Sequence, residues 1–503
     1  MTALSIPLPG GTDLCAVPQD GRTPSLKFRI SLLAGLLLLG ALAGYLASSG
    51  SITKVFALAA LLLPVAVWKR PHIAPAILLA AAVLVEQTPQ VPSIPLTQRI
   101  PLFQGVGPGH IQGGDMLLLL TTFVYLIKSV QWGPRWWPRS HVTMAMYGVL
   151  GCAVLAIVIG HAHGGDLRIS FMEARPYVYL AATYFLTAVL VTNRKAIQAM
   201  LWGFVGSVGF KSLQGIYLSV KSSHMNPKPD ALIGHEASYF FVIFFMLVPA
   251  LWVFRPPGRL RAVATGVLPF AIFACLVNDR RVAWEMLGGA ALCFGVIVYQ
   301  ALPKHRRRLF GKVTIAIILG AAVYFPVMWN KTNSVAAQPV RAVKSQIQPS
   351  VRDGSSDLYR VQENANLELN IKQGGVLGKG FGVKIDYALP IDDISKGDAL
   401  IAYVPHDDVL DVMMRMGILG GISMWFVIGA GIIAGSRLAR SVDREAAVIG
   451  VVVASSMVGW AIMAAEDQGF YMYRLTFMTG CLLGLAEAVR RLQRARDRRP
   501  ALR

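Results

Sequence analysis

Residues 262–301 read AVATGVLPFAIFACLVNDRRVAWEMLGGAALCFGVIVYQA, two long apolar runs separated by Asn278-Asp279-Arg280-Arg281. Each run has about the length that an α-helix needs to cross the hydrocarbon layer of a bilayer. Similar runs recur along all 503 residues, of which 54% are hydrophobic and only 15% are charged. Because lipid offers no partner to free backbone groups, spanning runs are helical. We expect an all-α polytopic membrane bundle, and we exclude a soluble enzyme, a disordered chain, a disulfide scaffold and a collagen-like fibre.

The apolar runs divide the chain into five parts. A tail at 1–28, which we expect to be disordered and cytoplasmic, precedes a transmembrane bundle at 29–328 with about eleven spans. A large external loop at 329–407, further spans at 408–489 and a basic cytoplasmic tail at 490–503 follow. We predict twelve to fourteen spans, because some runs are short: 29–48, 52–68, 73–86, 115–131, 142–162, 175–192, 196–219, 235–253, 262–278, 282–301, 309–328, 408–435, 446–465 and 470–489.

Lysine and arginine gather in alternate loops. Five short loops hold thirteen Lys or Arg and no Asp or Glu, namely 69–72, 132–141, 193–195, 254–261 and 302–308. The positive-inside rule places these loops, and with them both termini, in the cytoplasm. A formal charge of +21 is also typical of nucleic-acid binding. Because its distribution follows membrane topology, we expect no nucleic-acid partner.

The cysteines predict neither a disulfide framework nor a thiolate metal site. Four lie in apolar runs, one lies in the N-terminal tail, and no CxxC pair occurs. These residues are Cys15, Cys152, Cys275, Cys293 and Cys481.

Arg280 and Arg281 lie on the face where positive charge is not expected. One interpretation is that they anchor the helix at the interface and pair with Asp279 and with Glu285, one turn after Arg281. The other is anion binding, because guanidinium groups hold phosphate in a bidentate manner. The pattern alone leaves both open.

The external loop 329–407 is too long for a plain connection and suggests a function. Residues 357–370, which include Arg360, have the apolar spacing of a helix. They lead into the glycine-rich turn GGVLGKGFG at 374–382, which contains Gly380. Such a turn either exposes backbone N–H groups to an anion or serves as a plain turn.

His406 ends the external loop at the mouth of the predicted bundle. Asp407 or Asp408 is expected to cap the helix that follows. His406 is either a polar interfacial residue or a general base with a pKa near the working pH. A metal site with Asp407, Asp408, Asp392 and Asp393 lacks a second histidine at ligand spacing, so we expect no metal and no cofactor.

Three further cations lie near the external side or at membrane depth. Arg175 begins a predicted span, a position that indicates an interfacial anchor. Lys211, within GSVGFKSLQG, is expected to face protein or water rather than lipid. Lys211 either lines a substrate path or reaches the surface. Arg474 lies near the outer end of the last span, and the same two roles are open for it.

The order and spacing of three motifs resemble the O-antigen ligase and O-antigen polymerase superfamily. An external R-x-x-W after an apolar run is Arg281-Val-Ala-Trp284 here. A loop arginine and L-G-x-G-x-G are Arg360 and 377–382. The family pattern H-N-x-x-L-x-x-L-x-E-x-G corresponds to 406–417. In that last motif His406, Leu410 and Gly417 match, while Asp407 replaces Asn and Arg415 replaces Glu. The resemblance is strongest across 279–422.

The resemblance implies a GT-C-type glycosyltransferase of the bacterial inner membrane, acting in polysaccharide or lipopolysaccharide biosynthesis. Its donor would be a glycan on undecaprenyl diphosphate and its acceptor a hydroxyl of a lipid core, joined at the periplasmic face by inverting, metal-independent chemistry. The diphosphate leaving group requires cations, and the acceptor hydroxyl requires a base. By this resemblance Arg281 and Arg360 bind the diphosphate and His406 is the base. The supporting substrate contacts are Arg280, Arg175, Lys211, Gly380 and Arg474.

Two other functions stay open at this point. A polymerase of the same superfamily differs from a ligase only in its acceptor, which would be another lipid-linked repeat unit. A transporter or flippase of lipid-linked sugars would also need cations for the diphosphate. It would spread charge near the bilayer midplane, whereas here charge gathers at one face and in one loop, so we favour an enzyme.

Overall fold

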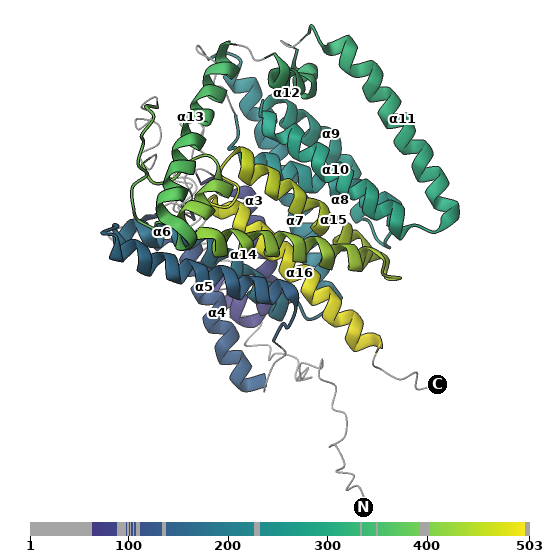
Figure 1. The fold of residues 1–503 in the computed structure, drawn as a ribbon. Helices are drawn as coiled ribbons and strands as arrows, with labels where there is room; N and C mark the ends of the chain where they lie inside the picture. Colours follow the sequence, from purple (N-terminus) through teal and green to yellow (C-terminus); the bar gives the residue numbers. More distant parts are fainter. Residues whose placement is uncertain are drawn as a thin grey trace, which may run out of the picture. The chain divides into compact units, whose positions relative to one another are not determined.

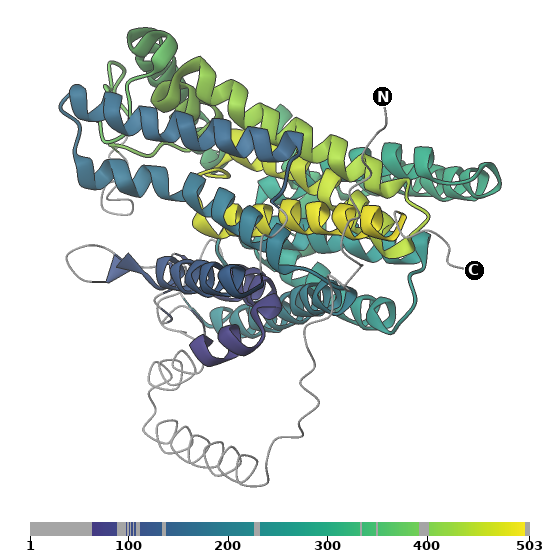
Figure 2. The same cartoon turned by 90° about the horizontal axis from the view of Figure 1, so that it is seen from below.

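The computed structural model describes residues 63–87, 97, 100, 102–103, 105–106, 111–132, 137–225, 232–331, 334–348, 351–391 and 402–497. Its contacts divide the chain into two compact units, Met1–Val65 and Ala66–Arg503. The second unit holds the elements discussed below. Its long helices run side by side (Figures 1 and 2).

The described residues of the second unit are almost all helical, with one two-stranded antiparallel hairpin. The first elements are η1 Pro71–Ile73, α3 Ala74–Leu84, β1 Gly105–Val106, β2 Ile111–Gln112, α4 Gly113–Trp132, α5 His141–Ala162, α6 Leu167–Leu190, α7 Arg194–Ser222, α8 Ala237–Phe254, α9 Leu260–Val277 and α10 Arg281–Ala301. The others are α11 Lys304–Met328, η2 Val335–Ala337, α12 Gln338–Ile347, α13 Val351–Gly374, η3 Gly375–Leu377, α14 Asp408–Ala439, α15 Arg444–Glu466 and α16 Tyr473–Asp497.

Eight of the described helices are long and apolar enough to cross a membrane: α4, α5, α8, α9, α10, α11, α14 and α15. This confirms the expected all-α polytopic bundle. Helices α6, α7 and α16 have 24, 29 and 25 residues, so they also have the length of a span. The predicted span 29–48 and most of 52–68 lie outside the described residues, so the total of twelve to fourteen stays a prediction.

Helices α15 and α16 form the centre of the bundle, where close packing depends on small side chains. Within lipid, helix association relies on close contact rather than on exclusion of water. Gly435 of α14 meets Gly450 of α15, and Gly480 of α16 meets Thr183 of α6. A Cβ at any of these glycines would overlap the facing helix.

The loops of the second unit meet at two opposite ends of the bundle. The loops that follow α6, α8, α10 and α14 share one end, which we call the basic rim. There Arg194 pairs with Asp443, Arg491 donates to the Val191 carbonyl and Arg440 donates to Gln300. The described parts of the loops that follow α5, α7, α9 and α15, and of the segment 329–407, share the other end, which we call the site rim. Successive loops therefore alternate between the two ends of the bundle, as the charge pattern predicts.

Candidate functional site

His406 lies at the site rim and is held by Glu363, a buried carboxylate of α13. The His406 backbone N–H donates to Glu363 Oε2 at 3.0 Å, and Nδ1 lies 3.2 Å from the same oxygen. The ring of Tyr359, one turn earlier on α13, packs edge-on against the imidazole at 5.6 Å. In the neutral ring, an Nδ1–H directed at the carboxylate leaves Nε2 as the basic nitrogen.

The surroundings of His406 raise the pKa of its imidazole above the ordinary value. Burial lowers this pKa, but the hydrogen bond and the charge of Glu363, together with the charge of Asp467, outweigh that effect. The charge of Arg360 opposes them. A raised pKa makes the neutral ring a stronger proton acceptor, which suits a general base.

Helix α13 presents three charged residues at intervals of three, so they follow one face. Asp357 Oδ1 pairs with Arg281 Nη2 at 2.7 Å. Arg360 Nη1 lies 3.6 Å from Glu466 Oε2 at the end of α15, and Glu363 holds His406. This single face of α13 links the three residues to which the sequence assigned the chemistry. The helix expected at 357–370 is confirmed, and it extends over Val351–Gly374.

Arg280 and Arg281 begin α10 after a strained turn. Asp279 has a positive φ of 50°, a conformation that non-glycine residues rarely adopt outside special sites. Its carboxylate is held by Arg341 of α12 at 2.9 Å. Arg281 also donates to Ser345 of α12 at 3.4 Å. The turn is therefore fixed by distant segments of the external loop as well as by its own helix.

Sequence reasoning missed a second imidazole–carboxylate pair, His235 and Asp467. His235 Nδ1 lies 2.7 Å from Asp467 Oδ2. Burial would raise the pKa of the Asp467 carboxyl, but the charge and hydrogen bond of His235, with the charges of Arg360 and His406, lower it. His235 directly follows the loop 220–234, and Asp467 lies in the loop 466–469. The charge pattern placed both loops on the external face, and that shared placement was the available signal. No motif surrounds either of them.

Asp407 and Asp408 have structural roles. Asp407 caps α14 as expected, accepting from the N–H groups of Val409 and Leu410 at 2.9 and 3.0 Å. Asp408 is buried and accepts from the N–H groups of 470 and 471. Among the described residues, no three His, Cys, Asp or Glu side chains are grouped as metal ligands. Asp392 and Asp393 lie outside that part of the chain.

Gly380 and its turn pack inside the protein. The N–H groups of four successive residues, 379–382, donate to groups of α14, α5 and α6. Gly380 has φ +83° and approaches Gly160 of α5 so closely that a Cβ would overlap it. Since the turn uses these N–H groups internally, the structure favours the plain turn over an anion cradle.

Arg415, which departs from the family motif, is buried and ion-paired. It lies 3.0 Å from Glu173 of α6 and 3.4 Å from Asp411, and it donates to the carbonyls of Val383 and Tyr403. Glu173 supplies the compensating charge from another helix. Arg415 therefore fastens the glycine-rich turn and the end of the external loop to the bundle.

Arg175 of α6 pairs with α4, the helix that follows the β1–β2 hairpin. Its Nε lies 3.6 Å from Asp115 of α4, and the guanidinium lies over the ring of Tyr473. The side chain is largely buried, so a surface anchor does not describe it. No contact in the described residues joins Arg175 directly to His406.

Lys211 and Arg474 form a buried ionic network. Lys211 Nζ lies 2.6 Å from Glu86, and Arg474 Nη1 lies 3.4 Å from Glu236. The four side chains are at most 1% exposed. Arg474 also donates to the carbonyls of residues 82 and 83, at the end of α3. The expectation that Lys211 faces protein rather than lipid is confirmed, and neither cation reaches the surface.

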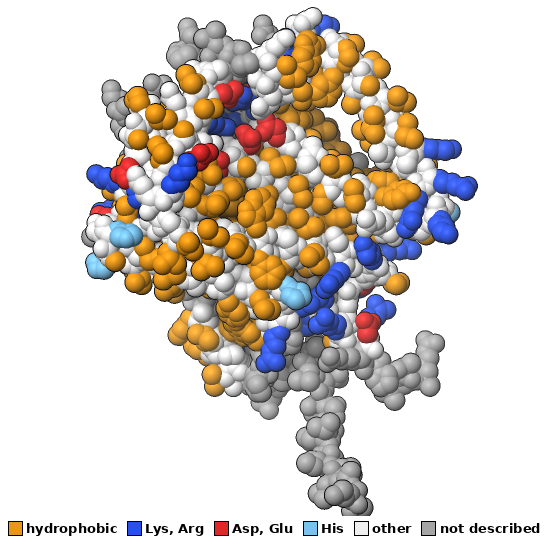
Figure 3. All heavy atoms as spheres, viewed as in Figure 1, with side chains coloured by type: hydrophobic (Ala, Val, Ile, Leu, Met, Phe, Trp, Pro, Cys, Tyr) orange, Lys and Arg blue, Asp and Glu red, His pale blue; other side chains and the backbone are white. Residues whose placement is uncertain are grey.

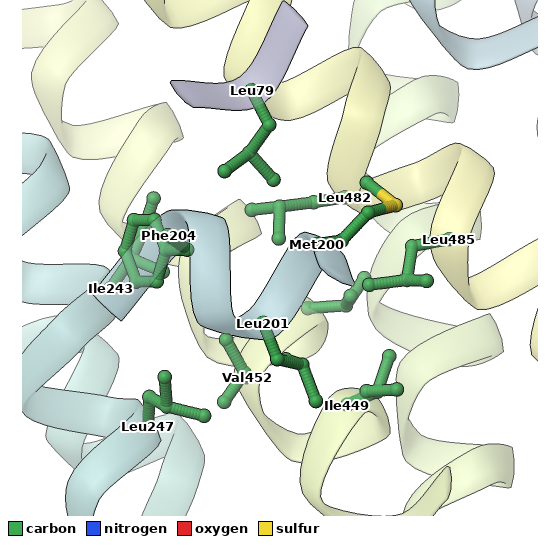
Figure 4. Close-up of a pocket in the computed structure, with 11 residues that line it drawn as sticks. Leu79, Met200, Leu201, Phe204, Ile243, Leu247, Ile449, Val452, Leu482 and Leu485 are labelled. Atoms are coloured by element: carbon green, nitrogen blue, oxygen red, sulfur yellow. The ribbon is translucent and has the colours of Figure 1, made fainter. Parts of the chain in front are cut away.

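An apolar pocket lies within the bundle between α3, α7, α8, α15 and α16 (Figure 4). Leu79, Phe204 and Leu482 are among its lining residues. It has no charged lining residue and includes none of the candidate site residues. The candidate chemistry is therefore at the site rim and not in this pocket. No protein-family model matches the chain, and no curated protein matches it.

Proposed function

We propose that this protein is a membrane glycosyltransferase of the O-antigen ligase and polymerase type. The observation that carries the proposal is the face of α13 on which Asp357, Arg360 and Glu363 engage Arg281, Glu466 and His406. A base and two guanidinium groups from distant parts of the chain are thereby linked at one rim. The resemblance of the motifs supplies the substrate class, a glycan on a polyprenyl diphosphate.

The proposed reaction is a displacement at the anomeric carbon. His406 Nε2 takes the proton of the acceptor hydroxyl while its oxygen bonds to that carbon. The bond from the carbon to the diphosphate oxygen breaks, and the electron pair leaves with the lipid diphosphate. Arg281 and Arg360 stabilise the charge that develops on the leaving group. Glu363 stabilises the imidazolium that forms and keeps the ring oriented.

The test is glycan transfer by the full chain reconstituted in closed liposomes. A defined glycan on polyprenyl diphosphate is the donor, and a lipid core or a second repeat unit is the acceptor in separate arms. We expect transfer in one arm, which distinguishes a ligase from a polymerase, and we expect transfer to persist in EDTA. Movement of the intact donor across the bilayer without transfer in either arm would instead indicate a flippase.

His406→Ala is expected to reduce transfer by at least about a hundredfold, the usual contribution of a general base. His305→Ala is the matched control, because His305 is exposed at the basic rim and should retain full activity. Equal folding of both variants is checked by their melting in detergent. Full transfer by His406→Ala would remove the base assignment.

A further inference from the structure

Helix α11 has the length of a span and buries none of its 25 residues. Every other candidate span in the described residues buries at least 28% of its apolar window. A helix packed on a bundle buries the stripe of side chains that faces its neighbours. Figure 1 shows α11 standing apart from α9 and α10, joined to the bundle through its ends. Its inward face therefore lacks a protein partner among the described elements.

The molecule is hollowed between α11 and the rest of the helices (Figure 3). We call this space the α11 slot. Helix α11 contributes exposed apolar side chains along its length, and the adjacent helices expose others. The exposed apolar side chains of α11 include Ile315, Ile318 and Leu319; those of α9 include Phe270 and Phe273, and those of α10 include Leu292 and Val296. Hydrophobic side chains lie on both sides of this hollow (Figure 3).

Helix α12 lies over the site-rim end of the α11 slot and carries cations without any acid. It is fastened to the start of α10 through Arg341 with Asp279 at 2.9 Å and Gln346 with Glu285 at 3.1 Å. Lys344 donates to the carbonyl of Trp329, just after α11, at 3.0 Å. Arg341 and Lys344 thus lie between α11 and Arg281, whose side chain contacts α12 through Ser345.

We propose that the α11 slot holds the isoprenoid chain of a polyprenyl diphosphate, with the diphosphate bound by α12 through Arg341 and Lys344 beside Arg281. This inference rests on the proposed function and assigns the entry path of its donor. An apolar slot that ends under a cationic helix matches a lipid with a long apolar chain and a compact anionic head.

A second copy of the chain is a poorer occupant of the slot. Helix α11 begins with Lys304-His-Arg-Arg-Arg308, and Lys312 follows one turn later. A two-fold contact between parallel α11 helices would bring these like charges together. The repulsion between these like charges disfavours self-association through α11.

Photo-crosslinking tests the chain-binding part. A photoreactive residue replaces Ile315 or Leu319 of α11, or, as a control, Leu119 or Phe123 of α4, which are equally exposed to lipid. The probe is labelled polyprenyl diphosphate without glycan, in nanodiscs of phosphatidylethanolamine and phosphatidylglycerol. We expect labelling from α11 to exceed that from α4 severalfold and to be competed by unlabelled diphosphate but not by polyprenol. Equal labelling of both helices, or crosslinks between two copies, would overturn the assignment.

Charge substitution tests the headgroup part. Arg341→Gln with Lys344→Gln should weaken binding of the same probe by about tenfold or more, with polyprenol binding unchanged. Arg306→Gln with Arg308→Gln, at the basic-rim end of α11, is the matched control. A triple variant adds Asp279→Asn to the first pair, because Arg341→Gln removes the cation that pairs with the Asp279 carboxylate. Asparagine also tolerates the positive φ at this position. Wild-type affinity in this folded triple variant would contradict the assignment.

The two proposals fail in different ways. If the wild-type protein transfers glycan but α11 labels no better than α4, the slot assignment is wrong and the transferase stands. If α11 labels selectively but no acceptor receives glycan, the lipid site stands and the transferase is wrong.

Discussion

Glu363 is buried beneath His406 and touches both its backbone and its ring, so one carboxylate fixes the orientation and the pKa of the proposed base. Sequence reasoning selected His406 from its motif but could not select Glu363, which lies 43 residues earlier. The pairing depends on α13 lying beside the start of α14. A residue's partner across such a distance is a property of the fold.

Replacing Glu363 is expected to shift the pH dependence of transfer. Because Glu363 raises the pKa of His406, the rate of the wild-type protein should fall as pH drops through a value above about 6.5, the ordinary pKa of histidine. In Glu363→Gln this acidic limb should move to lower pH, and the maximal rate should fall because the ring is less well oriented. A pH–rate profile measures both effects.

The control for this shift is Glu368→Gln, an exposed position on the same helix, which should keep the wild-type profile. The same linkage predicts a stability effect. The ion pair stabilises the fold at pH below the unfolded pKa of the histidine, and this contribution is lost as pH rises through the folded value. An acidic limb that stays in place in Glu363→Gln would show that His406 is not the titrating base.

Arg281→Lys is expected to lower transfer by at least about tenfold while the protein stays folded. Arg281 uses two guanidinium nitrogens toward Asp357, and an ammonium cannot reproduce that fork. Steady-state transfer at saturating acceptor measures the loss. Arg306→Lys at the basic rim is the control, and wild-type activity in Arg281→Lys would favour an interfacial anchor.

At the scale of elements, α14 shows how a motif residue serves the backbone. Gly417 interrupts the helix with φ 65° and ψ −166°. Any Cβ there would overlap the carbonyl of Val376 in the turn before Gly378. The glycine of the family motif thus lets the glycine-rich turn pack against α14. The sequence shows the motif that contains Gly417. The steric reason for this glycine becomes clear only from the contact between α14 and the glycine-rich turn.

Gly417→Ala should destabilise the protein by about 1–3 kcal/mol through strain at positive φ, and more if the turn is displaced. Gly429→Ala, further along the same helix, has open space around its Cβ. It should be neutral or stabilise by up to about 1 kcal/mol through helix propensity. Thermal melting of both variants in detergent gives the comparison. Equal stability of the two variants would contradict the packing argument.

Arg415 and the turn 379–382 show where motif interpretation fell short. Arg415 counted as a departure that weakened the family match, yet Glu173 from α6 neutralises it in the core. The turn was open to an anion-binding interpretation, yet its N–H groups are used by neighbouring helices. Glu173 lies more than 200 residues before Arg415, and the partners of the turn lie on α14 and on α5 and α6, the last two also more than 200 residues away.

At the scale of the whole molecule, the two rims provide a test of orientation. The charge pattern predicts that the basic rim faces the cytoplasm and the site rim the periplasm. Val442→Cys is fully exposed at the basic rim, and Ser223→Cys is exposed at the site rim. In intact cells an impermeant maleimide should label Ser223→Cys and should label Val442→Cys only after lysis. The reverse pattern would place His406 on the cytoplasmic side and exclude a periplasmic transferase.

The sequence by itself determined the fold class, the alternation of loops between two ends and the rim on which His406, Arg281 and Arg360 lie. Run length and charge spacing are local properties of a chain in lipid, so they can be read without the fold. Only the tertiary structure decided the partners of these residues, because a buried charge is matched by whichever helix packs beside it. The His235–Asp467 pair, the network of Lys211 and Arg474, and the unburied α11 all follow from helix packing that the sequence alone does not encode in any local pattern.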